Sequence, residues 1–142
     1  MPRGYSLVEL AVVLAIVGLV MGITLPRFGD VLDGIAVERA ASELTTALAA
    51  ARNGAVVRAT RARLSIAADS LRIDEWGDHG WERALCWPGP AAHGVAVVTS
   101  NPTVTFDPRG LGLGLANTRV VLWRGSQSAT ITTSRVGRVK RW

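Results

Sequence analysis

The segment GYSLVELAVVLAIVGLVMGITLP, residues 4–26, decides the fold because it is long, apolar and carries a single charged side chain, Glu9. It follows the short basic leader MPRG. As a helix, residues 5–25 would be about 30 Å long, enough to cross a bilayer. Placing a carboxylate in the bilayer core costs a free energy of about 3 kcal/mol on insertion scales. A charged residue at such a position therefore indicates a function and a positively charged partner. Glu9 is therefore the first candidate functional residue.

A newly made α-amino group is the best candidate partner for Glu9. A cut after Gly4 would make Tyr5 the first residue, and its amine would lie about one helical turn from the carboxylate. In a packed bundle of such helices, the two charges could pair between neighbouring subunits at staggered heights. Glu9 would then be an assembly device.

The opening GYSLVEL resembles the class III signal of type IV pilins and type II secretion pseudopilins. The usual signal has Phe, Thr and Ile where this chain has Tyr5, Ser6 and Val8, and each change keeps the chemistry. The resemblance implies cleavage after Gly4 by a prepilin peptidase and N-methylation of Tyr5. It also implies that the mature chain assembles with other pilins or pseudopilins through its apolar helix.

Two other interpretations of the apolar segment remain open. A secretory signal peptide has a short apolar core followed by a small-residue cleavage site, whereas this segment is long and ends in TLPRF. A plain membrane anchor, carrying a β-domain that binds a ligand without assembling, fits the length but gives Glu9 no role. The pilin resemblance implies a single-pass protein of the bacterial inner membrane, with its C-terminal domain in the periplasm, that then joins a pilus or pseudopilus.

Length, charge and cysteine content limit the remainder of the chain. There are 142 residues, with 16 basic against 11 acidic side chains and a net charge of +5. After the leader and the apolar helix, one modest globular domain remains. Cys86 is the only cysteine, which excludes an intrachain disulfide. Many major pilins have such a disulfide, so its absence favours a minor pilin, and Cys86 is predicted to be a small buried residue.

A second helical pattern follows Pro26, which is expected to kink or interrupt the helix. The pattern fades near residues 58–60. We expect one long helix whose first half lies in a membrane or filament core and whose second half packs an apolar stripe against a sheet. The stripe recurs at spacings of three to five residues, as Leu32, Ile35, Ala40, Leu44, Leu48 and Ala51.

From Arg61 onward the apolar period changes to two. Six short runs bounded by Gly, Pro, Asn and Asp predict strands, namely RARLSIAA, SLRIDEW, GVAVVTS, TVTFD, TRVVLWR and ATITTS. Their close spacing predicts antiparallel hairpins or a meander. The expected fold class is α+β, a long N-terminal helix packed on a small antiparallel β-domain. The expected parts are a removed leader (1–4), an apolar transmembrane helix (5–26), an amphipathic continuation (27–60) and a β-domain with a basic tail (61–142).

The later residues are similar to the GspH/FimT type of this family. Members typically show a Phe-x-x-x-Gly element and a final strand ending in Gly-Arg, which here are Phe106 with Gly110 and Gly137 with Arg138. The type includes minor pilins of type IV pili and the minor pseudopilin of type II secretion. The resemblance implies a structural protein of one of these machines, with no enzymatic activity and no cofactor.

The basic C-terminal tail is the second candidate site. Arg135, Arg138, Lys140 and Arg141 fall within seven residues, and Gly137 frees the backbone among them. In FimT-like minor pilins of naturally transformable bacteria, a C-terminal Gly-Arg-x-Arg pattern is implicated in binding DNA, and GRVK differs from it only by a lysine. The resemblance makes double-stranded DNA a candidate partner, held weakly and salt-dependently through its phosphates. The alternative is a solvated basic tail that protects an edge strand.

Other polar clusters give weaker predictions. Residues 74–79 lack the spacing of a calcium loop and are predicted to be a polar hairpin turn. His79 and His93 are too far apart to suggest a metal pair, so we expect neither a metal site nor a catalytic site. A second basic group could extend an anion-binding face if the fold brings it near the tail, namely Arg52, Arg58, Arg61 and Arg63. Packing in the core or in loops is predicted for Trp76, Trp81, Trp87 and Trp123.

Overall fold

The structure is a computed structural model that describes residues 4–114 and 117–142. Its one long helix, α1 (Leu7–Val57), is followed by short β-strands that alternate with turns. The chain divides into two compact units, the first ending at Leu32 and the second comprising Asp33–Trp142. The two units are described separately.

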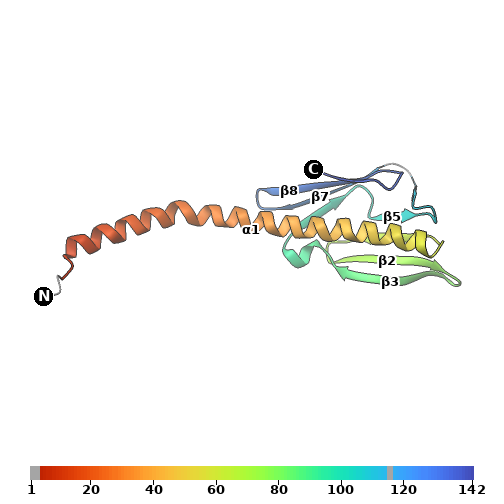
Figure 1. Ribbon diagram of the computed structural model, residues 1–142, viewed down its shortest axis with the longest axis horizontal. Helices are drawn as coiled ribbons and strands as arrows, with labels where there is room; N and C mark the ends of the chain where they lie inside the picture. Colours follow the sequence, from red (N-terminus) through yellow and green to blue (C-terminus); the bar gives the residue numbers. More distant parts are fainter. Residues whose placement is uncertain (1–3, 115–116) are drawn as a thin grey trace. The chain divides into compact units, whose positions relative to one another are not determined.

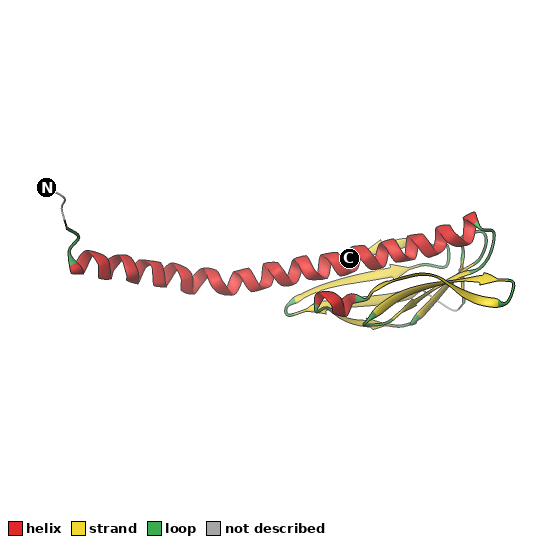
Figure 2. Ribbon diagram, turned by 90° about the horizontal axis from the view of Figure 1, so that it is seen from below, coloured by secondary structure: helices red, strands yellow, loops and turns green. Residues whose placement is uncertain are grey.

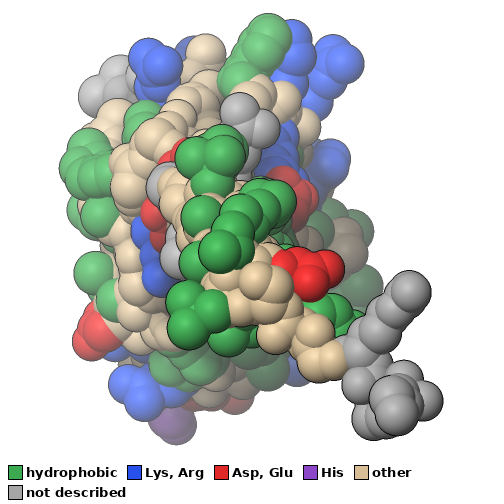
Figure 3. All heavy atoms as spheres, turned by 90° about the vertical axis from the view of Figure 1, so that its left-hand side faces the viewer, with side chains coloured by type: hydrophobic (Ala, Val, Ile, Leu, Met, Phe, Trp, Pro, Cys, Tyr) green, Lys and Arg blue, Asp and Glu red, His purple; other side chains and the backbone are tan. Residues whose placement is uncertain are grey.

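The first unit consists mainly of the N-terminal part of α1. Its side chains are exposed at residues 4–24 and 28–32, and Figure 3 shows hydrophobic side chains gathered at this end. The mean hydropathy reaches 2.5 over 18 residues, so this part of the helix is long and apolar enough to cross a membrane. The helix continues without a break through Pro26, so the predicted interruption does not occur. Proline removes one N–H from the helical ladder, and the turns on either side keep their bonds.

In the second unit, one face of α1 packs against the strands. The buried residues recur every three or four positions, and most of them are alanines, which let the helix backbone come close to the sheets. The predicted stripe is confirmed at Ala40, Leu44, Leu48 and Ala51. It is wrong at Leu32 and Ile35, which are exposed because packing begins at Val37. The buried face is formed by Val37, Ala40, Ala41, Leu44, Ala47, Leu48, Ala51 and Ala55.

Two antiparallel sheets lie along this part of α1 (Figures 1 and 2). The first sheet has the order β3 (Gly80–Pro88), β2 (Ser70–Gly77), β1 (Ala62–Ile66), β5 (Thr103–Phe106) and β6 (Gly112–Leu113). The second has the order β4 (Ala96–Thr99), β7 (Thr118–Arg124), β8 (Gln127–Thr133) and β9 (Val139–Arg141), and the short 3-10 helix η1 (Pro90–His93) leads into β4. The expected α+β fold class is confirmed.

One hydrophobic core joins α1 to both sheets. Leu64 and Ile73 face it from the first sheet, and Leu122 and Ile131 face it from the second. Alternation along each strand places these residues inward and their neighbours outward. This inward and outward alternation decides which polar side chains remain accessible on the domain surface.

Three strands were not predicted from the sequence. In β3, a register shift opposite Ile73 and Asp74 breaks the period of two, and β6 and β9 are only two and three residues long. The predicted polar hairpin turn over residues 74–79 is confirmed at Asp78 and His79, but it is shorter than expected. Strand β2 continues to Gly77, so Asp78 and His79 alone form the turn, and Asp74 is buried in the strand with Arg63 at 2.9 Å.

Cys86 and most of the tryptophans lie at the surface. Cys86 is exposed because it pairs in register with Arg72 on the outer face of the first sheet, so the buried position predicted for it is wrong. Trp76 and Trp81 form an edge-to-face pair across the β2–β3 hairpin, with ring centroids 5.3 Å apart. Trp87 alone among the four predicted tryptophans packs against the core.

Candidate nucleic-acid interface

The predicted processing and assembly residues lie at the start of the chain. Gly4 and Tyr5 precede the first turn of α1, and the Tyr5 side chain is exposed. Glu9 lies in that first turn, where a negative charge is favoured by the helix dipole. Within residues 4–114 and 117–142, the Glu9 side chain makes no hydrogen bond or ion pair. Its carboxylate is thus available to a group from outside the chain.

The basic tail is an ordered strand rather than a loose end. Strand β9 adds to the edge of β8 with Thr133 opposite Val139, Thr132 opposite Lys140 and Ile131 opposite Arg141. Beyond it, the backbones of Trp142 and Thr130 exchange two N–H···O hydrogen bonds, of 2.9 and 3.2 Å. The tail is therefore itself the edge strand of the second sheet.

Because side chains alternate along β9, Lys140 and Arg141 lie on opposite faces of the second sheet. Arg141 shares its face with the inward residues and forms a two-pronged ion pair with Glu38 of α1, in which Nη1 lies 2.6 Å from Oε1. Lys140 faces outward, with its ammonium 3.6 Å from the centre of the Trp142 ring. The sequence pattern did not reveal Glu38 as a partner, because the contact joins residues 103 positions apart. Arg141 is thus engaged within the domain, and Lys140 remains on the surface.

Gly137 allows the turn that leads into the tail. Its φ is 71°, and a Cβ there would lie 2.7 Å from the Gly110 carbonyl oxygen and 2.9 Å from Nε of Arg52. Only glycine adopts this backbone at no steric cost and leaves room for the close approach. Arg52 donates a 3.0 Å hydrogen bond from Nε to the same carbonyl. The two glycines of the family-like motifs therefore meet at one arginine of α1.

The second basic group does not form a single face. Arg52 contacts the turns at Gly110 and Gly137, which lead into the tail. Arg58 pairs with Glu75 at 2.5 Å, and Arg63 pairs with Asp74. Pairing with carboxylates neutralises these two side chains, so of these three arginines Arg52 is the one that extends the tail region.

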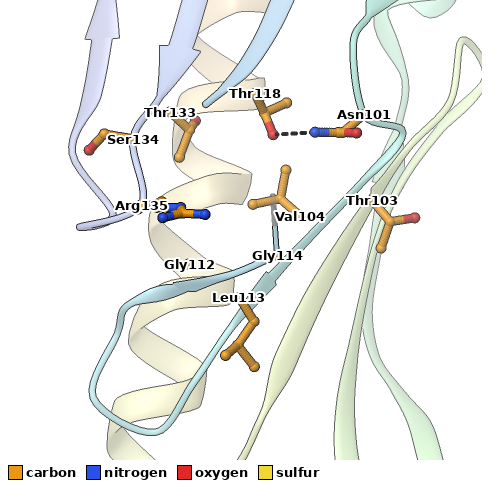
Figure 4. A pocket seen from close by; sticks show the side chains of 10 residues that line it. All are labelled: Asn101, Thr103, Val104, Gly112, Leu113, Gly114, Thr118, Thr133, Ser134 and Arg135. Carbon is orange, nitrogen blue, oxygen red and sulfur yellow. Dashed lines mark hydrogen bonds between the residues drawn. The ribbon is translucent and has the colours of Figure 1, made fainter. Parts of the chain in front are cut away.

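Two depressions flank the turn at Ser134. The larger, of about 280 Å³, has Arg135 on its wall beside polar side chains, and Figure 4 shows the 3.5 Å hydrogen bond from Asn101 to Thr118 across it. The smaller, of about 220 Å³, is lined by Arg138 and Lys140. Ser134 lines both depressions. The turn thus presents cations on two sides.

Charge is strongly asymmetric in the last quarter of the chain. Residues 108–142 contain no acidic residue and seven basic ones. Acidic groups from elsewhere neutralise three of these, in the pairs Asp107–Arg109, Asp33–Arg124 and Glu38–Arg141. Within the described part of the chain, no acidic partner contacts the other four, which are Arg119, Arg135, Arg138 and Lys140. This region therefore has an excess of positive charge that attracts anions.

Asp107 holds the turn that carries Gly110. Its carboxylate accepts hydrogen bonds from the backbone N–H groups of Leu111 at 2.8 Å and Arg109 at 2.9 Å. The Leu111 bond is the main cause that holds the pKa of Asp107 below the ordinary value of 3.8, with help from Arg109 and against the effect of burial. The backbone of this turn thus favours the ionised form of the Asp107 carboxylate.

We expect replacement of Asp107 by asparagine to lower the thermal stability of the domain at neutral pH. A carboxyl whose pKa is lowered by folding stabilises the fold above its unfolded pKa, and this contribution is lost as the pH falls through the folded value. The difference in Tm between the two proteins should therefore shrink below about pH 4. Circular dichroism melting curves from pH 7 to pH 3 measure it. A difference that stays constant over this range would contradict the role of the charge.

In the described residues, no three His, Cys, Asp or Glu side chains lie close enough together to hold a metal ion.

The geometry combines a helix that is apolar in its first half, an antiparallel two-sheet domain packed on the second half, and a basic edge strand. These features define the class of pilin-like proteins.

Comparison with known proteins identifies the family. Residues 2–25 match the prokaryotic N-terminal methylation motif, and residues 40–137 match the family described as type II transport protein GspH. The chain belongs to this GspH family. It is also 26% identical over 159 aligned positions to the pilin-like protein PilA1 of Thermus thermophilus, covering 97% of each chain.

Solved structures of minor pilins and pseudopilins share the fold. The type IV minor pilin FimU of Pseudomonas aeruginosa matches with a TM-score of 0.64 and 16% identity, over 73% of this chain and 86% of that one. The minor pseudopilin EpsH of the type 2 secretion system of Vibrio cholerae matches with a TM-score of 0.62 and 10% identity, over 75% of this chain and 95% of that one. At these identities the likeness concerns the fold alone.

Proposed function

We propose that this protein is a minor pilin or pseudopilin that is anchored in the inner membrane before assembly, with its C-terminal domain in the periplasm. A prepilin peptidase cuts after Gly4, Tyr5 is methylated, and the chain joins a type IV pilus or a type II secretion pseudopilus through α1. The observation that carries this proposal is Glu9, the one charged residue between Gly4 and Arg27, in the exposed apolar part of α1. Membership of the GspH family supports it.

We further propose that the basic tail binds double-stranded DNA, as a pilin serving natural transformation would. Arg135, Arg138 and Lys140 contact phosphates, because they are exposed and no acidic residue in the described part of the chain neutralises them. Gly137 contributes through the turn that presents them. Arg141 contributes least, since its guanidinium is held by Glu38. Phosphate contacts of this kind release counterions and give binding that is independent of sequence and weakens with salt.

The test measures binding of the full-length chain in non-ionic detergent to duplex DNA across a salt series. We expect the double variant Arg138→Ala, Lys140→Ala to reduce the salt slope by about two, since each lost phosphate contact reduces it by about one. Arg141→Ala is the matched control, because it removes the same charge from the same strand. It should change the slope much less and cost at most about 1 kcal/mol of stability, as for an exposed ion pair.

The outcome separates two roles within the same family. A folded wild-type chain that does not bind DNA at low salt would refute the DNA proposal and leave filament priming or protein secretion as the function of the domain. Equal losses in the Arg141→Ala chain and the double variant would instead show that the whole tail acts as a diffuse charge.

A further inference from the structure

Arg119 lies on the outer face of the second sheet, in β7. The neighbouring Val120 and the next inward residue, Leu122, are buried in the core, whereas Arg119 is exposed. Successive side chains of a strand point to opposite faces, so Arg119 faces away from α1. Arg119 is not part of the tail motif, because it lies 15 positions before Ser134, where the tail turn begins.

Strand register places Arg119 in the same row as the tail. Arg119 is directly opposite Thr132 of β8, and Thr132 is directly opposite Lys140 of β9. Residues paired in this way point to the same face of a sheet. At a strand spacing of about 4.8 Å, the backbones of Arg119 and Lys140 are about 10 Å apart. The row continues to Ser100, whose hydroxyl accepts a 3.0 Å hydrogen bond from the N–H of Arg119.

The surroundings of this row favour an anion. The next outward row consists of Val98, Val121, Thr130 and Trp142, which carry no side-chain charge. In the described part of the chain, no acidic residue pairs with Arg119 or lies within β4, β7, β8 and β9. The guanidinium therefore keeps its full charge and its donors.

We infer that Arg119 binds the phosphate backbone of the same DNA that the tail binds, so that the binding surface is the outer face of β7, β8 and β9 rather than the tail alone. This inference rests on the proposed DNA-binding function. A span of about 10 Å covers about three phosphates of one strand, at 3.4 Å of helix axis for each. Arg119 and Lys140 thus hold phosphates at the two ends of the row, while the Thr132 hydroxyl lies between them.

The test compares Arg119→Gln with Arg83→Gln, in the full-length chain in non-ionic detergent, by duplex DNA binding over a salt series. Arg83 is the matched control, because it is also exposed and lies on a strand of the other sheet, opposite Asp74. We expect Arg119→Gln to weaken binding about tenfold at low salt, the effect of one lost charge-assisted contact, and to lower the salt slope by about one. Arg83→Gln should bind as the wild type does.

A further variant, Arg119→Lys, separates charge from structure. It should keep the salt slope of the wild type, because lysine still contacts phosphate as a point charge, whereas a merely structural role would not depend on charge. If Arg119→Gln binds as well as Arg83→Gln while the Arg138, Lys140 double variant binds weakly, Arg119 is outside the site and the tail proposal stands. If the folded wild type does not bind at low salt, both proposals fall.

Discussion

A chain in which alanine replaces Glu9 is expected to remain in the inner membrane and to be almost absent from purified filaments. The Glu9 carboxylate is the only charged side chain between Gly4 and Arg27, and we propose that it pairs with the N-terminal amine of Tyr5 in a neighbouring subunit. Removing one partner of a buried ion pair costs about 3–5 kcal/mol, which corresponds to a loss of more than about a hundredfold in incorporation. Immunoblots of filament and membrane fractions measure the ratio.

Three further variants determine what Glu9 supplies. Glu9→Gln keeps the size and removes the charge, so it should fail as alanine does, whereas Glu9→Asp should restore part of the incorporation. Leu10→Ala is the control, because it changes the neighbouring exposed side chain and no charge. Normal incorporation of the Glu9→Ala chain would refute the assembly role. A wild-type chain that never enters filaments would instead support the anchored, non-assembling binding domain.

Truncation of Phe106 to alanine is expected to cause the largest loss of folding stability. Phe106 is the largest of the fully buried side chains in the described residues, with 1% of its surface exposed. Its strand, β5, leads directly into the turn that carries Gly110. Replacing a buried phenylalanine by alanine costs about 3–5 kcal/mol, from lost burial and the cavity that remains. This is a large part of the roughly 5–15 kcal/mol that stabilises a typical domain.

Urea unfolding followed by tryptophan fluorescence measures this loss in the full-length chain in detergent. Leu113→Ala is the control, because Leu113 lies on the adjacent strand β6 and is 45% exposed. Its unfolding midpoint should shift only slightly, since exposed substitutions usually change stability by less than about 0.5 kcal/mol. A Phe106→Ala chain as stable as the Leu113→Ala chain would mean that the core can collapse around the missing ring.

Local patterns predicted the elements whose signal is periodic. The apolar run before Pro26 and the stripe from Ala40 to Ala51 gave the helix, and runs with a period of two gave most of the strands. These patterns succeed because burial repeats with the geometry of the backbone, every 3.6 residues in a helix and every two in a strand. Strand β9 was missed because its pairing with β8 comes from backbone hydrogen bonds over only three residues.

The contacts of the candidate site could not be predicted from local patterns, because they join residues that are distant in the sequence. The sequence placed Arg141 with the tail cations, but the structure places its guanidinium on Glu38. It also placed Arg52 in a separate group, although Arg52 lies under Gly110 and Gly137. No spacing rule reveals such partners, since they are chosen by which faces of the helix and the sheets come together.

The sequence by itself determined that residues 5–26 form an apolar helical segment with one carboxylate, that the helix continues and packs on a β-domain, and that residues 135–141 are basic. Local chemistry suffices for these properties, because hydropathy, charge and period belong to neighbouring residues. Only the tertiary structure decided which cations remain free, because neutralisation by Asp33, Glu38 and Asp107 depends on the fold. Strand register then placed Arg119 beside the tail, since pairing between β7, β8 and β9 sets which side chains share a face.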